Sequence, residues 1–161
     1  MIIILMGVSG SGKTTIGESL AAELGWSFYD GDDFHPAANI EKMAHGIALT
    51  DADRASWLAA LAKLIRDLHT DGRSGILACS ALKQAYRTML QQNLPDVQFV
   101  YLKGSYDLIL KRLKARKGHY MRPELLQSQF DAMEEPGQAL VLDIAQSPAT
   151  LIRQIRDAFK I

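Results

Sequence analysis

The segment Gly7–Thr14, GVSGSGKT, carries residues that could hold a chain of phosphates. Its spacing is the full phosphate-loop pattern, in which Gly7 and Gly12 flank the loop and Lys13 and Thr14 close it. In such a loop, glycines let backbone N–H groups turn onto phosphate oxygens, and the following helix adds its positive N-terminal dipole. The lysine reaches the β- and γ-phosphates, and the threonine hydroxyl can ligate Mg²⁺. We therefore expect a nucleoside triphosphate to bind Gly7, Val8, Ser9, Gly10, Ser11, Gly12, Lys13, Thr14 and Thr15.

Carboxylates follow a short apolar segment at Asp30, Asp32 and Asp33, and His35 comes shortly after them. A carboxylate at the end of a strand can hydrogen-bond an acceptor hydroxyl, take up its proton late in phosphoryl transfer, or hold a water on Mg²⁺. The alternative is a turn rich in Asp and Gly without a chemical role. The segment is a candidate for the acceptor side of a phosphoryl transfer.

Cations occur in two further segments. Arg54 lies three residues before Trp57, so the two are near one another on a predicted helix. Ser80, Lys83 and Arg87 follow a third apolar segment, and the two cations are four residues apart, which predicts one helical face aimed at the open end of the sheet. An exposed helix arginine is ordinary when taken alone. Together, these cations suit a small anion such as a carboxylate.

The densest positive stretch runs over residues 111–119, KRLKARKGH. Such a charge run can be no more than a solvated helix face. Behind a phosphate loop, it can instead form a lid that closes cations over the transferring phosphoryl group and excludes water. We expect a lid over about residues 112–124.

Apolar segments alternate with helical patterns along the chain. Met1–Met6 is a continuous apolar run, which is typical of a parallel strand covered on both faces. The alternation predicts βαβ units with right-handed crossovers, and hence a three-layer α/β/α fold with a five-stranded parallel sheet. Ligands of such sheets bind at the carboxyl ends of the strands, where all the segments above would lie. The five predicted strands are Met1–Met6, Trp26–Tyr29, Ile76–Cys79, Val97–Leu102 and Ala139–Asp143.

Helix boundaries are marked by three local signals. Gly25 is a plausible stop for the helix behind the phosphate loop. Thr50 and Asp53 resemble a capping box, and Ser147-Pro148 is a suitable start for the last helix. The long central helix is expected to bury one apolar face, made of Leu58, Leu61, Ile65 and Leu68.

Composition limits the classes of function. The 161 residues fit one domain, residues 1–161, and 18 basic against 18 acidic residues give no field that would favour nucleic acid or an anionic membrane. Met1–Met6 is too short for a signal peptide or a membrane span. The single cysteine, Cys79, excludes an internal disulfide and fits a reducing cytoplasm. The chain lacks the Asn-Lys-x-Asp guanine reader of GTPase switches, and a large ATPase would need more chain for a hydrolytic strand-end Asp and for arginine fingers. A small ATP-dependent kinase remains.

Several segments together resemble the gluconate kinase (gluconokinase) family of small phosphate-loop kinases, which are related to shikimate and nucleoside-monophosphate kinases. The similarity spans nearly the whole chain, and the two longest motifs discriminate far better than the phosphate loop. The matching segments are Gly7–Thr14, Asp30–Leu58, Cys79–Arg87, Val100–Gly104, Arg112–Met121 and Gln129–Pro136.

The resemblance implies transfer of the γ-phosphoryl group of ATP to the 6-hydroxyl of D-gluconate in a protein that is commonly a homodimer. Asp32 would be the partner of the acceptor hydroxyl, as a base or as a Mg²⁺-water ligand beside Thr14. Lys13 and Arg116 would act on the phosphoryl group, and Arg112 would lie near the adenine. The residues that would line the sugar-acid site are Asp32, His35, Arg54, Ser80, Lys83, Arg87 and His119.

Two alternatives remain open at this point. A shikimate-type or nucleoside-monophosphate kinase shares the loop, the carboxylates and the lid, although a nucleotide acceptor calls for an apolar slot that the sequence does not clearly offer. A regulatory module that binds a nucleotide without catalysis would be favoured by loss of Asp32 or of the lid cations, and both are present.

Overall fold

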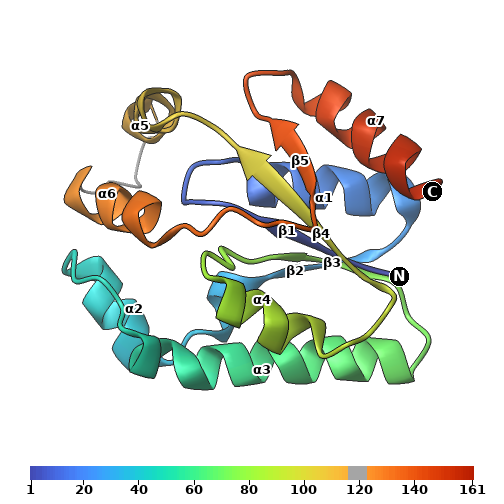
Figure 1. Cartoon of the computed structure of the whole chain (residues 1–161), viewed down its shortest axis with the longest axis horizontal. Helices are drawn as coiled ribbons and strands as arrows, with labels where there is room; N and C mark the ends of the chain where they lie inside the picture. The colour runs from blue at the N-terminus through green and yellow to red at the C-terminus, as the bar shows by residue number, and fades with distance from the viewer. Residues whose placement is uncertain (116–122) are drawn as a thin grey trace.

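The computed structural model describes residues 1–115 and 123–161 of the chain. In this part of the chain, five strands form one all-parallel sheet in the order β2-β3-β1-β4-β5 (Figure 1). Each strand differs from its predicted bounds by no more than one residue at either end. The strands are β1 (Ile2–Met6), β2 (Ser27–Asp30), β3 (Gly75–Ala78), β4 (Val97–Lys103) and β5 (Leu140–Asp143).

Helices connect the strands, and the three predicted boundary signals are confirmed. Gly25 ends the first helix in the left-handed conformation, Thr50 and Asp53 form a capping box, and Ser147 caps the last helix. None of the described helices has the length and apolar composition that crossing a membrane requires. The helices are α1 (Lys13–Leu24), the 3₁₀ helix η1 (Gly31–Phe34), α2 (Ala37–Ala44), α3 (Asp51–Thr70), α4 (Gln84–Gln91), α5 (Tyr106–Ala115), α6 (Pro123–Ala132) and α7 (Pro148–Phe159).

The central strand β1 explains the three layers. Its side chains alternate between two cores, with Ile3 and Leu5 in one and Ile2, Ile4 and Met6 in the other, and all five are 0% exposed. Helices α1 and α7 cover the first face of the sheet, and α3 and α4 cover the second (Figure 1). The predicted three-layer α/β/α fold is confirmed.

The long helix α3 anchors the second face. Its predicted apolar residues Leu58, Leu61, Ile65 and Leu68 are all at most 2% exposed, as is Trp57. Each such side chain contributes about 1.5–3 kcal/mol when it leaves water. This packing fixes the N-terminal turn of α3 beside the carboxyl ends of β2 and β3.

Helix α2 was not predicted, because its exposed Ile40 gives no apolar stripe. Polar contacts with the start of α3 hold it instead. The buried Asn39 amide donates to the Asp53 carbonyl at 2.8 Å, and Lys42 Nζ contacts both Asp53 carboxylate oxygens at 2.8 and 2.9 Å. Asp53 also accepts from the Thr50 backbone N–H in the capping box. These contacts, the Lys42 hydrogen bond first, lower the pKa of Asp53 from its ordinary 3.8 to about 2.

The lowered pKa predicts an acid-dependent loss of stability. A carboxylate with a depressed folded-state pKa stabilises the fold above its unfolded pKa, and that contribution disappears as the pH falls from about 4 towards 2. Replacement of Asp53 by Asn should therefore flatten the fall in the free energy of unfolding over this range, and Lys42→Met should flatten it in part. Urea unfolding from pH 5 to pH 2.5 measures the effect. An unchanged pH slope in Asp53→Asn would contradict it.

Candidate active site

The phosphate loop joins the end of β1 to the start of α1. Gly12 precedes the helix in the left-handed region with φ 99°, and α1 begins with neither a side-chain cap nor an acidic residue in its first turn. A Cβ added at Gly7 would lie 2.9 Å from the Leu102 carbonyl oxygen, so the loop start requires glycine. The first turn of α1 thus supplies backbone N–H groups and no acidic residue of its own, as an anion site requires.

Lys13 folds back over the loop. Its Nζ donates to the Gly7 and Val8 carbonyl oxygens, both at 3.0 Å. The backbone N–H of Ser9 donates to Gln129 Oε1 on α6 at 2.7 Å, and the Gln129 amide donates to Ser9 Oγ at 3.1 Å. Gln129 lies 120 positions away in the sequence, and sequence reasoning assigned it no role.

The carboxylate that contacts the loop threonine is Asp30, which the sequence offered as one of three candidates without a role of its own. Thr14 Oγ1 donates to Asp30 Oδ2 at 3.1 Å, and the Asp32 backbone N–H donates to Asp30 Oδ1 at 3.0 Å. A hydroxyl beside a carboxylate supplies the hard oxygen donors that Mg²⁺ prefers, with phosphate oxygens and waters completing the shell. No group of three or more His, Cys, Asp or Glu side chains suited to a metal ion occurs in residues 1–115 and 123–161. Thr14 and Asp30 thus fit a Mg²⁺ ion whose remaining ligands come from the phosphates of a bound nucleotide and from water.

Asp32 lies on η1 and His35 directly follows it, and this turn is fixed from two sides. The Trp57 indole donates to the Gly31 carbonyl oxygen at 2.7 Å, and a Cβ at Gly31 would lie 2.6 Å from the Ala78 carbonyl oxygen, so β3 passes close behind the turn. The ring of the half-buried His35 stacks on Trp57 at 4.5 Å between centroids and 11° between planes. Burial lowers the pKa of His35, Asp32 opposes this shift and Arg54 adds to it. The Asp32 side chain is exposed to solvent.

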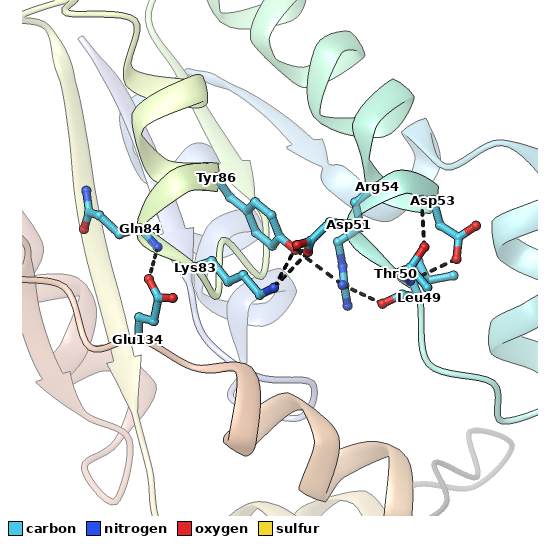
Figure 2. Close-up of polar contacts among 9 residues, drawn as sticks. All are labelled: Leu49, Thr50, Asp51, Asp53, Arg54, Lys83, Gln84, Tyr86 and Glu134. Atoms are coloured by element: carbon cyan, nitrogen blue, oxygen red, sulfur yellow. Dashed lines mark hydrogen bonds and ion pairs between the residues drawn. The ribbon is translucent and has the colours of Figure 1, made fainter.

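The predicted cations Arg54 and Lys83 meet around one tyrosine and one carboxylate (Figure 2). Lys83 Nζ contacts both oxygens of Asp51 at 2.9 and 3.1 Å, and the Tyr86 hydroxyl donates to the same carboxylate. Arg54 donates to the Leu49 carbonyl oxygen at 2.6 Å and lies 5.8 Å from the centre of the Tyr86 ring. Lys83 lies 5.7 Å from the same centre. We call Asp51, Arg54, Lys83 and Tyr86 the acceptor cluster.

The contacts in the acceptor cluster shift the pKa values of its members. Hydrogen bonds from Tyr86 and then Lys83 lower the pKa of Asp51, and the hydrogen bond to Asp51 raises the pKa of Lys83. Burial, followed by the hydrogen bond to Asp51, raises the pKa of Tyr86. At neutral pH the cluster therefore combines two cations with one carboxylate and a neutral phenol.

The expectation that Lys83 and Arg87 share an outward helical face is wrong. Lys83 precedes α4 in an extended conformation, and Arg87 is 3% exposed inside the helix. The Arg87 guanidinium donates to the Ala81 and Leu82 carbonyl oxygens at 2.9 and 3.1 Å, so it supports the loop that carries Lys83. The half-buried Ser80 lies in this loop, and its carbonyl oxygen accepts from the Gly7 N–H at 3.2 Å. Burial raises the pKa of the neighbouring Cys79 thiol to about 12, which rules it out as a nucleophile.

The expected lid, residues 112–124, includes the end of α5 and the start of α6. Residues 116–122, between the two helices, lie outside the part of the chain that the structure describes. Arg112 lies in the last turn of α5, and its guanidinium donates to the Ile144 carbonyl oxygen behind β5 at 2.5 Å. Arg116 and His119 lie outside the described residues. Their assigned roles stay predictions.

A cavity of about 490 Å³ opens beside the Thr14–Asp30 pair, between α1 and the edge strand β2. Glu18, Tyr29 and Phe34 are among its walls. Neither Arg54 nor Lys83, the two cations of the acceptor cluster, lines this cavity. This cavity adjoins the metal-suited pair and does not by itself define the acceptor site.

Comparison with known proteins identifies the family. The family model for shikimate kinase matches residues 9–144. The thermosensitive gluconokinase of Escherichia coli (strain K12) is 47% identical over 159 residues, covering 96% of this chain and 85% of that protein. The crystal structure of a gluconokinase from Sinorhizobium meliloti 1021 matches with a TM-score of 0.85 at 40% identity, covering 94% of this chain and 87% of the other.

A third match is the unliganded crystal structure of a sugar kinase from Janibacter sp. HTCC2649. Its TM-score is 0.92 at 43% identity, over 99% of this chain and 94% of the other. The family model thus places the chain in the broad shikimate kinase group, and the whole-chain identities select one branch of it. The chain belongs to the gluconokinase family of phosphate-loop kinases.

Proposed function

We propose that this chain transfers the γ-phosphoryl group of ATP to the 6-hydroxyl of D-gluconate, giving 6-phospho-D-gluconate and ADP. The observation that carries the proposal is the 40–47% identity to gluconokinases over most of the chain. The geometry agrees with it, because the phosphate loop, the carboxylates after β2 and the acceptor cluster are all at the carboxyl edge of one parallel sheet.

The donor is held by the start of α1. The N–H groups of the loop and helix receive the phosphate oxygens, and Lys13 stabilises the charge that spreads over the transferring group. Bound near Thr14 and Asp30, Mg²⁺ would neutralise charge on the β- and γ-phosphates. We assign the metal-side carboxylate to Asp30, since its Oδ2 accepts from the Thr14 hydroxyl. We then assign Asp32 as the carboxylate that contacts the acceptor hydroxyl.

Asp32 is suited to the acceptor because it is exposed at the same edge and is held on the rigid turn η1. Its carboxylate orients the 6-hydroxyl and accepts the proton as the bond to phosphorus forms. His35 contributes an uncharged ring at neutral pH, because burial lowers its pKa. A neutral imidazole can hydrogen-bond a sugar hydroxyl without repelling a cation.

The acceptor cluster fits the carboxylate end of gluconate. Arg54 and Lys83 supply two cations against the single carboxylate of Asp51, which leaves positive charge for a monoanion. Asp51 and Tyr86 add polar groups that can meet sugar hydroxyls. Arg87 is a support for the Lys83 loop in this assignment, and Arg112, Arg116 and His119 remain candidates for nucleotide and phosphoryl contacts.

The assembly and location of the protein are further proposals. We propose one domain over residues 1–161 that forms a homodimer in the cytoplasm, as the resemblance and the single cysteine lead us to expect. Sedimentation equilibrium at micromolar concentration tests the dimer, and a monomer mass would contradict it.

A coupled ATP–ADP assay across several acceptors tests the substrate. We expect turnover with D-gluconate, and at most about a hundredth of its kcat/KM with shikimate or a nucleoside monophosphate. The carboxylate of shikimate can also pair with the acceptor cluster, but its ring carries no primary hydroxyl to reach Asp32, and a nucleoside monophosphate has a base for which the sequence offers no clear apolar slot. No turnover with gluconate, or a preference for shikimate, would reject the proposal.

Replacement of Asp32 by Asn removes the proton acceptor and keeps the side-chain shape. We expect kcat to fall by about a hundredfold or more, with the Kd for ATP changed by less than about threefold. Steady-state kinetics and calorimetric titration with a nonhydrolysable ATP analogue measure the two quantities. Equal losses in both would argue against the assigned role.

Replacement of Lys83 by Met removes one cation of the acceptor cluster. We expect the KM for gluconate to rise by about tenfold or more, since a charge-assisted hydrogen bond is lost, and the KM for ATP to stay within about twofold. Lys63→Met is the matched control, because Lys63 pairs with Asp67 on the exposed side of α3. A rise in the ATP KM alone would place Lys83 on the donor side.

A further inference from the structure

One peptide group of the phosphate loop is held from both sides. The carbonyl oxygen of Val8 accepts from Lys13 Nζ at 3.0 Å, and the N–H of the same peptide, on Ser9, donates to Gln129 Oε1 at 2.7 Å. In a trans peptide the C=O and N–H point in opposite directions. A partner that fixes the N–H therefore also fixes the direction in which the carbonyl faces Lys13.

Gln129 is itself held rigidly. Its neighbour Leu126 on α6 is 0% exposed in the core, and Phe130 packs edge-to-face on Tyr106 of α5 at 5.5 Å between ring centres. Two residues after the end of α6, the Glu134 N–H donates to the Leu82 carbonyl oxygen at 2.9 Å, and the Glu134 carboxylate accepts from the Gln84 N–H at 2.7 Å. The Glu134–Gln84 contact is visible in Figure 2. Helix α6 is thus tied to α5 and to the start of α4.

The amide of Gln129 is directed at the loop. Its oxygen accepts from the Ser9 N–H, and its nitrogen donates to Ser9 Oγ at 3.1 Å. Because both polar atoms of the Gln129 side chain bond to Ser9, its effect on the loop passes through Ser9. Flanking Gly7 and Gly10 have φ values of 144° and 81°, so the backbone around this peptide adopts conformations that few other residues tolerate and gains from an external partner.

We propose that Gln129 is a positioning residue for phosphoryl transfer: by holding the Val8–Ser9 peptide, it sets the position of Lys13 against the triphosphate. The inference rests on the proposed function, in which Lys13 stabilises the transferring group. A small displacement of that ammonium weakens an interaction made in the transition state and leaves the binding of the sugar acid intact.

Gln129→Leu keeps the side-chain size and removes both hydrogen bonds. We expect kcat to fall by about tenfold or more, with the KM for gluconate within about twofold and Tm within about 2 °C of the wild type. Gln127→Leu is the matched control, because Gln127 lies on the exposed side of the same helix and bonds only to Asp131 among the described residues. The control should keep wild-type kcat and KM. A wild-type kcat in Gln129→Leu would overturn the proposal, and so would a loss explained by a fall in Tm.

A double-mutant cycle with Lys13→Met tests whether Gln129 acts through Lys13. If it does, Gln129→Leu should cost less than about threefold in the Lys13→Met background, against about tenfold or more in the wild type. An equal fold-loss in the two backgrounds would overturn the proposal.

Hydrogen exchange of the Ser9 amide separates this inference from the proposed function, because it needs no acceptor. By NMR, exchange should accelerate by about tenfold or more in Gln129→Leu and stay unchanged in Gln127→Leu. Unchanged exchange in Gln129→Leu would overturn the inference, whatever the substrate. Absence of gluconate turnover in the wild type, with accelerated Ser9 exchange in the variant, would reject the proposed function and leave the link between Gln129 and the loop established.

Discussion

The N–H groups at the start of α1 are the feature on which the rest of the site depends. They point at the sheet edge because β1, with all five side chains of Ile2–Met6 at 0% exposure, fixes where the loop begins. On the far side, Ile16 and Leu20 fix the helix against the same core. Between these two anchors, the loop must turn with glycines in conformations that bring backbone donors together. A helix end of this kind carries a partial positive charge and favours an anion.

The same parallel register brings the acceptor side to the donor. Strand β3 lies between β1 and β2, so the carboxyl ends of the three strands present the loop, the carboxylates and the Lys83 loop next to one another. Buried side chains then hold each segment in place: Trp57 holds the turn with Asp32, and Arg87 holds the loop with Lys83. The exposed carboxylate of Asp32 and the half-buried amine of Lys83 can therefore meet a substrate without a large ordering cost, since their supports are already packed.

The sequence predicted the sheet closely because apolar residues mark each strand, most clearly the continuous run Ile2–Met6. It predicted the helix caps because Gly25, Thr50 and Ser147 act locally. Helices α2 and α6 were missed. Helix α2 is held by polar contacts to Asp53. On α6, the four-residue spacing of Leu126 and Phe130 was an apolar signal that could have been read.

Within the site, the phosphate loop and the meeting of Arg54 with Lys83 followed from spacing and strand order. The inward turn of Arg87 did not, because four-residue spacing assumes that the helix includes Lys83, which lies before it. Asp30 was one of three candidate carboxylates, and its place as the last residue of β2 could have marked it as the partner of Thr14. Gln129 gave no local signal, since its contact with Ser9 depends on how α6 packs.

The central claim is that the loop delivers a phosphoryl group to the terminal hydroxyl of gluconate. Phosphorus NMR of the product formed from ATP and D-gluconate tests it most directly, because proton coupling reports which carbon carries the phosphate. The account predicts a phosphomonoester signal coupled to the two protons of the C6 methylene. A signal coupled to a single methine proton, or ADP formed with inorganic phosphate as the sole new product, would contradict it.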